Sequence, residues 1–233
     1  MKNITQGLLV SCVAFSGISA TGTQEQESAP KAGMRPQDRT VLAQRKQQHG
    51  VDPLFVTRTS PRAMSGEPIT KEQLYTLFEA ARWAPSSYND QPWVFIYALR
   101  GTPEWQTLFN LLVDFNQQWV KNAGALVVIV SRNAFEKSGK PNATHSFDTG
   151  AAWENLSLQG HISGLVIHGM AGFDYERAKK DLTIPDGYTV EAMFVVGKPG
   201  SLEQLPQEMR GMEKPSDRKP IEDFAFKGSF GKK

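Results

Sequence analysis

Apolar residues recur at helical spacing in the stretch that follows Ile69. The sequence Thr70-Lys71-Glu72-Gln73 matches a capping box, in which the side chains of Thr70 and Gln73 each bond the backbone N–H of the other residue. The apolar positions then follow one helix face, at Leu74, Leu77, Phe78 and Ala81. We therefore expect a helix that starts after Thr70 and ends before Pro85, because the residue before proline disfavours the α conformation.

Continuous apolar runs alternate with further helical patterns along the rest of the chain. The expected strands and short apolar segments are residues 93–99, 125–130, 165–168 and 190–196. Two more helices are expected, one from Thr102-Pro103-Glu104 that carries Trp105, Leu108, Leu112 and Phe115, and one over 148–163 that Gly164 closes. This mixture, without a regular βαβ order and without an internal repeat, indicates a layered α+β or α/β domain.

The N-terminal fifty residues differ from this pattern. Residues 1–20 contain Lys2, an apolar stretch and a small-residue end at Ala20, which is typical of a short secretory signal. Leu9 to Cys12 also resembles a lipobox, but too few apolar residues precede it, so a cleaved signal ranks first; a packed helix or a misplaced start codon is the remaining alternative. Export to the periplasm follows if the leader is cleaved, and a cytoplasmic location otherwise. Residues 21–50 are polar and predict a linker or a solvated helix before a domain over 51–233.

Composition and motifs exclude several classes of function. The 233 residues are 39% hydrophobic and 21% charged, and the net charge of +2 is too small for a nucleic-acid-binding protein. The leader is too short to span a bilayer comfortably. Cys12 is the single cysteine, and the four histidines show no metal-binding spacing. The chain also lacks a glycine-rich phosphate loop and a G-x-S-x-G elbow, so neither a Rossmann domain nor a serine hydrolase is supported. Because the single cysteine lies in the leader, redox chemistry would need a bound cofactor.

Three polar segments combine in a more informative way. Residues 85–93 (PSSYNDQPW) place hydroxyls, amides and free backbone N–H groups between a helix end and a strand. Arg58-Thr59-Ser60-Pro61-Arg62 lies before the first core helix, and Pro215-Ser216-Asp217-Arg218 lies near the C-terminus. Each of these two segments joins arginine to a hydroxyl, which suits a phosphate monoester, although a single arginine is more often a surface charge.

Together these segments resemble the nitroreductase family of FMN-dependent oxidoreductases, over about residue 51 to the C-terminus. The resemblance implies an α+β fold in three α/β/α layers, with a central and mainly antiparallel sheet flanked by helices. It also implies a domain-swapped homodimer with two flavins at its interface. The apolar segment Ile221–Phe226 is expected to pack on the other subunit.

The resemblance also implies a set of cofactor-binding residues. Arg58, Ser60 and Arg218, with Ser216 beside them, would hold the FMN phosphate, and Arg62 would lie near the flavin pyrimidine. A backbone N–H at Ala171 or Gly172 would face flavin N5, and Asn116 would bond the pyrimidine edge. The turn residues would reach the flavin of the partner subunit, and they are Pro85, Ser86, Ser87 and Asn89. Trp119 stands where some relatives have a lysine.

The implied activity is that of an FMN-dependent NAD(P)H oxidoreductase. Hydride would pass from NAD(P)H through flavin N5 to a nitroaromatic, a quinone or a similar small acceptor in a ping-pong reaction, with no catalytic side chain required. The short polar segment 132–147 lacks the helices that cover the flavin in some relatives, so an open flavin face is expected. The alternatives are another flavin chemistry, such as reductive dehalogenation or flavin cleavage, and a flavin-storage protein without turnover. The sequence does not select between NADH and NADPH.

Overall fold

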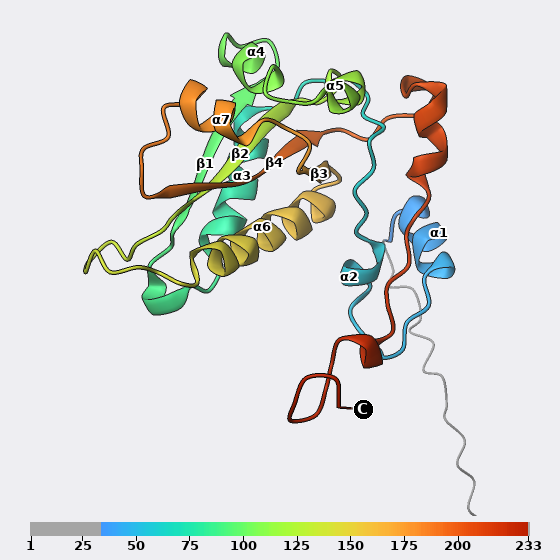
Figure 1. The fold of residues 1–233 in the computed structure, drawn as a ribbon. Coiled ribbons are helices and arrows are strands. Elements are labelled where there is room, and N and C mark those ends of the chain that lie inside the picture. Colours follow the sequence, from blue (N-terminus) through green and yellow to red (C-terminus); the bar gives the residue numbers. More distant parts are fainter. Residues whose placement is uncertain (1–33, 233) are drawn as a thin grey trace, which may run out of the picture.

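The computed structural model describes residues 34–232 (Figure 1). The expected leader over 1–20 and the first part of the polar segment 21–50 lie outside these residues. The described part of that segment contains helix α1 (Pro36–Gln44), which packs against the short helix α2 (Pro53–Thr57) and buries Val41. The described part of the polar stretch is therefore helical over Pro36–Gln44 and irregular over 45–50.

A four-stranded sheet forms the centre of the domain. Its order is β1 (Trp93–Leu99), β2 (Ala125–Arg132), β4 (Tyr188–Gly197) and β3 (Val166–Met170), and every neighbouring pair is antiparallel. The expected antiparallel sheet is thus confirmed. β2 and β4 lie in the middle, and β2 and the second half of β4 are buried on both faces, which explains their continuous apolar sequences.

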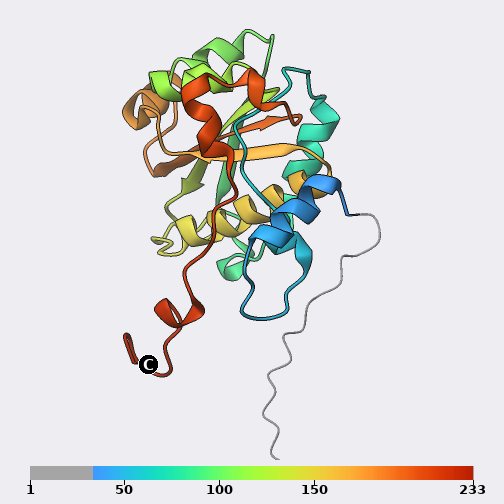
Figure 2. The same cartoon turned by 90° about the vertical axis from the view of Figure 1, so that its right-hand side faces the viewer.

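Helices cover both faces of the sheet and produce the expected three layers (Figures 1 and 2). Helices α3 (Lys71–Arg82) and α6 (His145–Ile162) pack on one face. Helices α4 (Glu104–Phe109), α5 (Asp114–Val120) and α7 (Tyr175–Asp181) pack on the other face. The sequence pattern did not predict α7.

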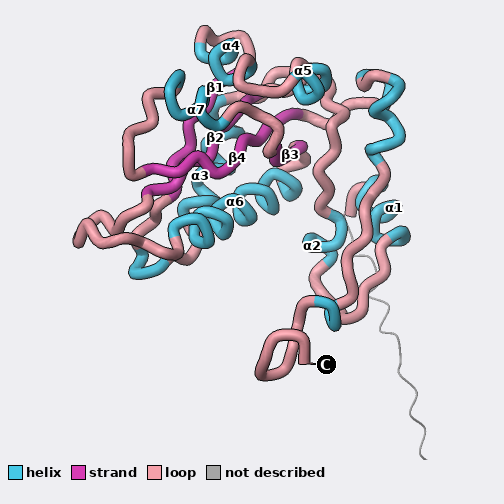
Figure 3. The backbone as a smooth tube through the Cα atoms, in the orientation of Figure 1, coloured by secondary structure: helices cyan, strands magenta, loops and turns pink. Residues whose placement is uncertain are grey.

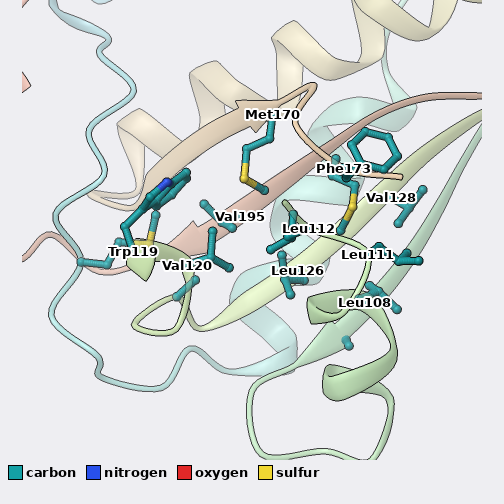
Figure 4. Packing of buried hydrophobic residues seen from close by; sticks show 14 of the residues in the cluster. Leu108, Leu111, Leu112, Trp119, Val120, Leu126, Val128, Met170, Phe173 and Val195 are labelled. Carbon is teal, nitrogen blue, oxygen red and sulfur yellow. The ribbon is translucent and has the colours of Figure 1, made fainter. Parts of the chain in front are cut away.

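Strand β2 contributes to both hydrophobic cores because successive side chains point to opposite faces of a strand. Leu126, Val128 and Val130 belong to the core under α4 and α5. Ala125, Val127 and Ile129 belong to the core under α3 and α6. Figure 4 shows the first of these cores around its larger members, which include Leu108, Leu111, Trp119 and Met170.

The predicted capping box is present at the start of α3. Thr70 Oγ1 accepts from the Gln73 N–H at 3.1 Å, and Gln73 Oε1 accepts from the Thr70 N–H at 2.9 Å. Ile69 and Leu74 are buried in the same core. Helix α3 ends at Arg82, before Pro85, as expected.

The single helix expected after Thr102 was wrong, because the chain forms α4 and α5 with a break between them. The Val113 N–H donates to the Gly172 carbonyl oxygen at 3.1 Å, and the Asp174 N–H donates to the Leu111 carbonyl oxygen at 2.8 Å. The Val113 N–H and the Leu111 carbonyl oxygen therefore bond a distant segment instead of continuing the helix. Phe115 consequently lies on α5, where it is 44% exposed.

Other boundaries differ slightly from the expectation. Helix α6 begins at His145, three residues before the expected Asp148, and Gly164 follows its end with φ 72°. Within residues 34–232, every helix is too short or too polar to be a transmembrane span.

Beyond β4 the chain forms short 3-10 turns, η2 (Leu202–Gln204), η3 (Gln207–Glu213) and η4 (Ile221–Asp223), joined by loop (Figure 3). The last part of this C-terminal segment extends away from the sheet. Phe224 is 64% exposed and Phe230 is 97% exposed. The segment therefore presents aromatic side chains that this chain leaves uncovered.

Candidate functional site

The structure brings the two predicted phosphate-binding segments together around three arginines. Arg58 is the C-cap of α2, and its Nη1 donates to Ser60 Oγ at 3.1 Å. Arg218 Nη1 likewise donates to Ser216 Oγ at 3.1 Å. Both pairs thus place a guanidinium beside a hydroxyl, which is a suitable donor set for a phosphate group.

Arg45 joins these two segments, although the sequence did not single it out. Its Nε donates to the Ser216 carbonyl oxygen at 3.0 Å, and its Nη1 donates to the carbonyl oxygens of Val56 and Arg58. Arg45 is the C-cap of α1. It stands in a polar run whose composition is that of an ordinary solvent-exposed helix face, so the local sequence does not mark it. We call Arg45, Arg58 and Arg218 the arginine cluster.

The arginine cluster concentrates positive charge. Burial lowers the pKa of Arg45, the charges of Arg218 and Arg58 lower it further, and Asp217 opposes this effect. Three cations close enough to disfavour one another's charge would be stabilised by a bound anion. The Glu154 carboxylate lies 4.0 Å from Arg58 Nε and is half exposed, so it compensates little of this charge.

Arg62 lies at the other end of the segment 58–62 and packs over an aromatic ring. Its guanidinium carbon is 5.9 Å from the centroid of Trp119, and its buried Nε has no hydrogen-bond partner in the described chain. The backbone N–H of Arg62 donates to Glu213, whose carboxylate also lies 3.8 Å from Nη1. Arg62 therefore keeps an unused donor while Glu213 holds its backbone in place.

A buried chain of contacts connects Arg62 to the turn after β3. Trp119 Nε1 donates to Asn116 Oδ1 at 3.3 Å, and Asn116 Nδ2 donates to the Gly172 carbonyl oxygen at 2.9 Å. Asn116 is 8% exposed, so its amide orients the turn at Gly172. A Cβ at Gly172 would lie 2.7 Å from Asn116 Nδ2, which explains why glycine is needed there.

The turn itself presents unused backbone donors. Within residues 34–232, the N–H groups of Ala171 and Gly172 donate to no other group. The carbonyl oxygen of Gly172 is occupied by Val113 and Asn116, which holds the turn against α5. The turn can therefore offer an N–H to an external acceptor without losing an internal bond.

The turn of residues 85–89 lies on a different side of the domain. It follows α3 and contacts the start of α6, where the Ser87 N–H donates to Asp148 Oδ2 at 3.0 Å. In Figure 1 it lies well away from α2 and the C-terminal segment, which carry Arg58 and Arg218. Ser86, Ser87 and Asn89 therefore do not meet Arg58 within one chain.

This turn has an unusual backbone. Tyr88, Asn89 and Gln91 all have φ between 50° and 56°, a region that residues other than glycine seldom adopt. The Gln91 N–H bonds Ser86 Oγ at 3.0 Å, and Asp90 pairs with Arg132 at 2.9 Å. Tyr88 is 91% exposed as a result. Such a constrained and exposed turn is typical of a binding surface.

The fold and this site define a three-layer α/β/α protein with a cationic site that joins its N-terminal and C-terminal segments. The chain belongs to the Nitroreductase family, whose sequence model matches residues 56–198. A solved structure described as an oxidoreductase containing FMN is 44% identical. That match covers 81% of this chain and 97% of the other, with a TM-score of 0.77.

Other relatives are more distant. A Bacillus subtilis protein with the provisional name NAD(P)H nitroreductase MhqN is 25% identical, over 72% of this chain and 93% of the relative. A Streptomyces coelicolor protein provisionally named NADH dehydrogenase/NAD(P)H nitroreductase is 23% identical, over 68% of this chain and 90% of the relative. A Desulfovibrio desulfuricans structure in complex with FMN has a TM-score of 0.60 at 21% identity, over 79% of this chain and 99% of the other, and supports the fold alone.

Proposed function

We propose that this chain is an FMN-dependent NAD(P)H oxidoreductase of nitroreductase type. The observation that carries the proposal is the arginine cluster, because two segments 160 residues apart in the chain, at Arg58 and Arg218, converge with their hydroxyls on one cationic site. The 44% identical structure is described as containing FMN, whose phosphate would match this site. Bound FMN would supply hydride exchange between NAD(P)H and an acceptor.

The residues near the turn after β3 suit the ring of the same cofactor. The backbone N–H groups of Ala171 and Gly172 are unused in the described chain and would donate to flavin N5. The unpartnered Nε of Arg62 would face the pyrimidine edge, where a cation favours the reduced, anionic flavin. Asn116 would act mainly by orienting Gly172, with its second N–H left for the pyrimidine.

We further propose a homodimer in which each flavin site uses both subunits. Pro85, Ser86, Ser87 and Asn89 lie away from the arginine cluster of their own chain, so they would complete the site of the partner. Exposed aromatic residues near this turn and α6 would be covered in such a dimer, and they are Trp83, Tyr88 and Phe147. The C-terminal segment with Phe224 would be exchanged between subunits.

The first experiment is the visible spectrum of the purified protein, followed by anaerobic addition of NADH or NADPH. A bound-flavin spectrum that bleaches supports the oxidoreductase, and multiple turnovers with a quinone exclude a storage role. A flavin that stays oxidised with both nucleotides contradicts NAD(P)H as the reductant. Failure to bind FMN after reconstitution refutes the whole assignment.

Two further measurements address the assembly and the leader. Sedimentation equilibrium is expected to give a dimer mass, and a monomer at micromolar concentration would contradict the shared site. Export remains a prediction for residues 1–20. N-terminal sequencing of protein from fractionated cells is expected to show a start near Thr21. An intact Met1 in the cytoplasmic fraction would exclude a cleaved signal.

A further inference from the structure

A β-bulge in the first half of β4 changes the direction of Glu191, whose side chain is 23% exposed. In the pairing of β2 with β4, Ile129 lies opposite Ala192 and Val130 lies opposite Val190, so Glu191 has no partner of its own. A bulge of this kind redirects a side chain, and bulges are frequent next to active sites. The bulge therefore places this carboxylate where regular alternation along β4 would not place it.

Three polar side chains surround one oxygen of this carboxylate. Ser131 Oγ donates to Glu191 Oε1 at 2.5 Å, and Ser146 Oγ donates to the same oxygen at 2.7 Å. His145 Nδ1 lies 2.7 Å from Ser131 Oγ and 3.5 Å from Glu191 Oε1. Because Ser131 uses its hydrogen on Glu191, His145 bonds it as an Nδ1–H donor. The order of donation is thus His145 to Ser131 to Glu191.

Glu191 also lines a cavity of about 330 Å³ between α6 and the strands β3 and β4. This volume lies at the lower end of the range for small-molecule sites, about 300–1,000 Å³. The wall is largely apolar and includes Trp153, Met170 and Met193, and Glu191 is its single ionisable residue among those described. Such a cavity suits a planar apolar molecule with one polar edge.

A second polar group in the wall lacks a partner. Thr149 is 2% exposed, and its buried Oγ1 forms no hydrogen bond in the described chain. A buried hydroxyl without a partner is costly and points to a ligand atom that would satisfy it. Gly150 and Gly169 keep the wall near Thr149 and Trp153 open.

The cavity also reaches the turn after β3, because Ala171 forms part of its wall. We propose that it is the subsite for a planar acceptor with a carbonyl or nitro oxygen, and that Glu191 delivers a proton to that oxygen. This inference rests on the proposed function, since the hydride would come from the reduced flavin near Ala171. For a quinone, one hydride gives the hydroquinone monoanion, and the single proton from Glu191 completes the hydroquinone.

The hydrogen-bond chain explains how Glu191 regains its proton. The Glu191 carboxyl gives its proton to the acceptor, Ser131 passes its hydroxyl proton to Glu191, and His145 passes its Nδ1 proton to Ser131. The His145 side chain is 21% exposed and exchanges with solvent. His145 is the ionisable group in contact with Glu191 among the described residues. The relay thus gives Glu191, itself 23% exposed, a second route by which protons from solvent reach the cavity.

The test compares Glu191→Gln with Glu176→Gln, an exposed glutamate on α7, in FMN-loaded protein. After anaerobic reduction, stopped-flow traces follow flavin reoxidation by duroquinone, which needs a proton, and by ferricyanide, which needs none. Glu191→Gln is expected to slow reoxidation by duroquinone about a hundredfold and to remove its pH dependence, while ferricyanide rates stay unchanged. If Glu191→Gln slowed flavin reoxidation by both acceptors equally, or slowed neither, the proton-donor role would be overturned.

A binding measurement tests the subsite without turnover. Thr149→Val is expected to raise the dissociation constant of duroquinone for the oxidised holoprotein roughly fivefold, measured by quenching of tryptophan fluorescence, with FMN affinity unchanged. A loss of FMN affinity in Thr149→Val or Glu191→Gln would overturn the inference, because the cavity would then belong to the flavin itself. Failure of the proposed function is distinct, since the wild-type protein would then lack a reducible flavin.

Discussion

The Arg45 guanidinium donates a hydrogen bond to the backbone carbonyl oxygen of Arg58 at 3.0 Å. Arg45 precedes residues 56–198, the stretch that the family model matches. It also bonds the Ser216 carbonyl oxygen, so a residue outside the matched stretch connects both halves of the arginine cluster. Helix α1 is thereby tied to the proposed cofactor site.

Arg45→Ala is expected to weaken FMN binding roughly tenfold, about the free energy of one charge-assisted hydrogen bond. The reason is that the segments around Arg58 and Ser216 lose their common donor. Fluorescence titration of the apoprotein with FMN measures the effect, with Lys46→Ala as the matched control. Equal affinities of the two variants would contradict this role.

Arg62→Ala is expected to lower the reduction potential of bound FMN by roughly 30 mV, since about 1.4 kcal/mol corresponds to that shift in a two-electron couple. The cation would otherwise stabilise the reduced flavin. Anaerobic titration against a redox dye measures the potential, and Arg82→Ala, on the exposed end of α3, is the control. An unchanged potential would exclude Arg62 from the pyrimidine edge.

Gly172→Ala is expected to disturb the turn after β3. The added Cβ would lie 2.7 Å from Asn116 Nδ2 and 3.2 Å from Val113 Cγ2, so overpacking of about 1–3 kcal/mol is expected. FMN affinity should fall with the stability. Gly211→Ala, where a Cβ meets nothing within 4 Å, should change neither quantity. Urea unfolding and FMN titration of both variants decide the point.

Two glycines of α6 should respond in opposite directions. At Gly160 a Cβ would lie 2.3 Å from Ile167 Cγ1, whereas at Gly150 it would meet nothing within 4 Å. Gly160→Ala should therefore lower the free energy of unfolding by about 1–3 kcal/mol. Gly150→Ala should raise it by up to about 1 kcal/mol, because alanine is the better helix former. Urea denaturation measures both, and equal effects would show that α6 does not pack closely on β3.

His168 should make the folded protein sensitive to acid. Burial lowers the pKa of the His168 imidazole, and the charge of Arg62 lowers it further. In the unfolded chain the same imidazole has a pKa of about 6.5. Below that pH the unfolded chain takes up a proton that the folded protein resists, so the free energy of unfolding falls as pH drops toward the folded pKa.

His168→Gln removes this contribution, so its stability should depend less steeply on pH between about 7.5 and 5.5 than that of the wild type. Urea unfolding at several pH values measures the slope. Part of the slope should remain, because burial and then Arg35 also lower the pKa of His161. Identical slopes for His168→Gln and the wild type would refute the assignment.

The sequence alone determined the features that depend on neighbouring residues. The capping box of Thr70 and Gln73 and the apolar run of β1 were predicted correctly, and so was Gly164 beyond α6. Each of these features depends on backbone hydrogen bonds or on a periodicity that spans only a few positions. The residues that produce it are therefore neighbours in the sequence. The ordered segments at 58–62, 85–93 and 215–218 were also enough to indicate the family, as the match over 56–198 confirms.

Tertiary structure decided what depends on residues far apart in the chain. The break between α4 and α5 follows from the bond of Val113 to Gly172, and the role of Arg45 follows from its contacts with Arg58 and Ser216. Glu191 enters its cavity because β4 carries an extra residue against β2. None of these has a local signature, because each hydrogen bond or register shift joins segments that only the folded chain brings together.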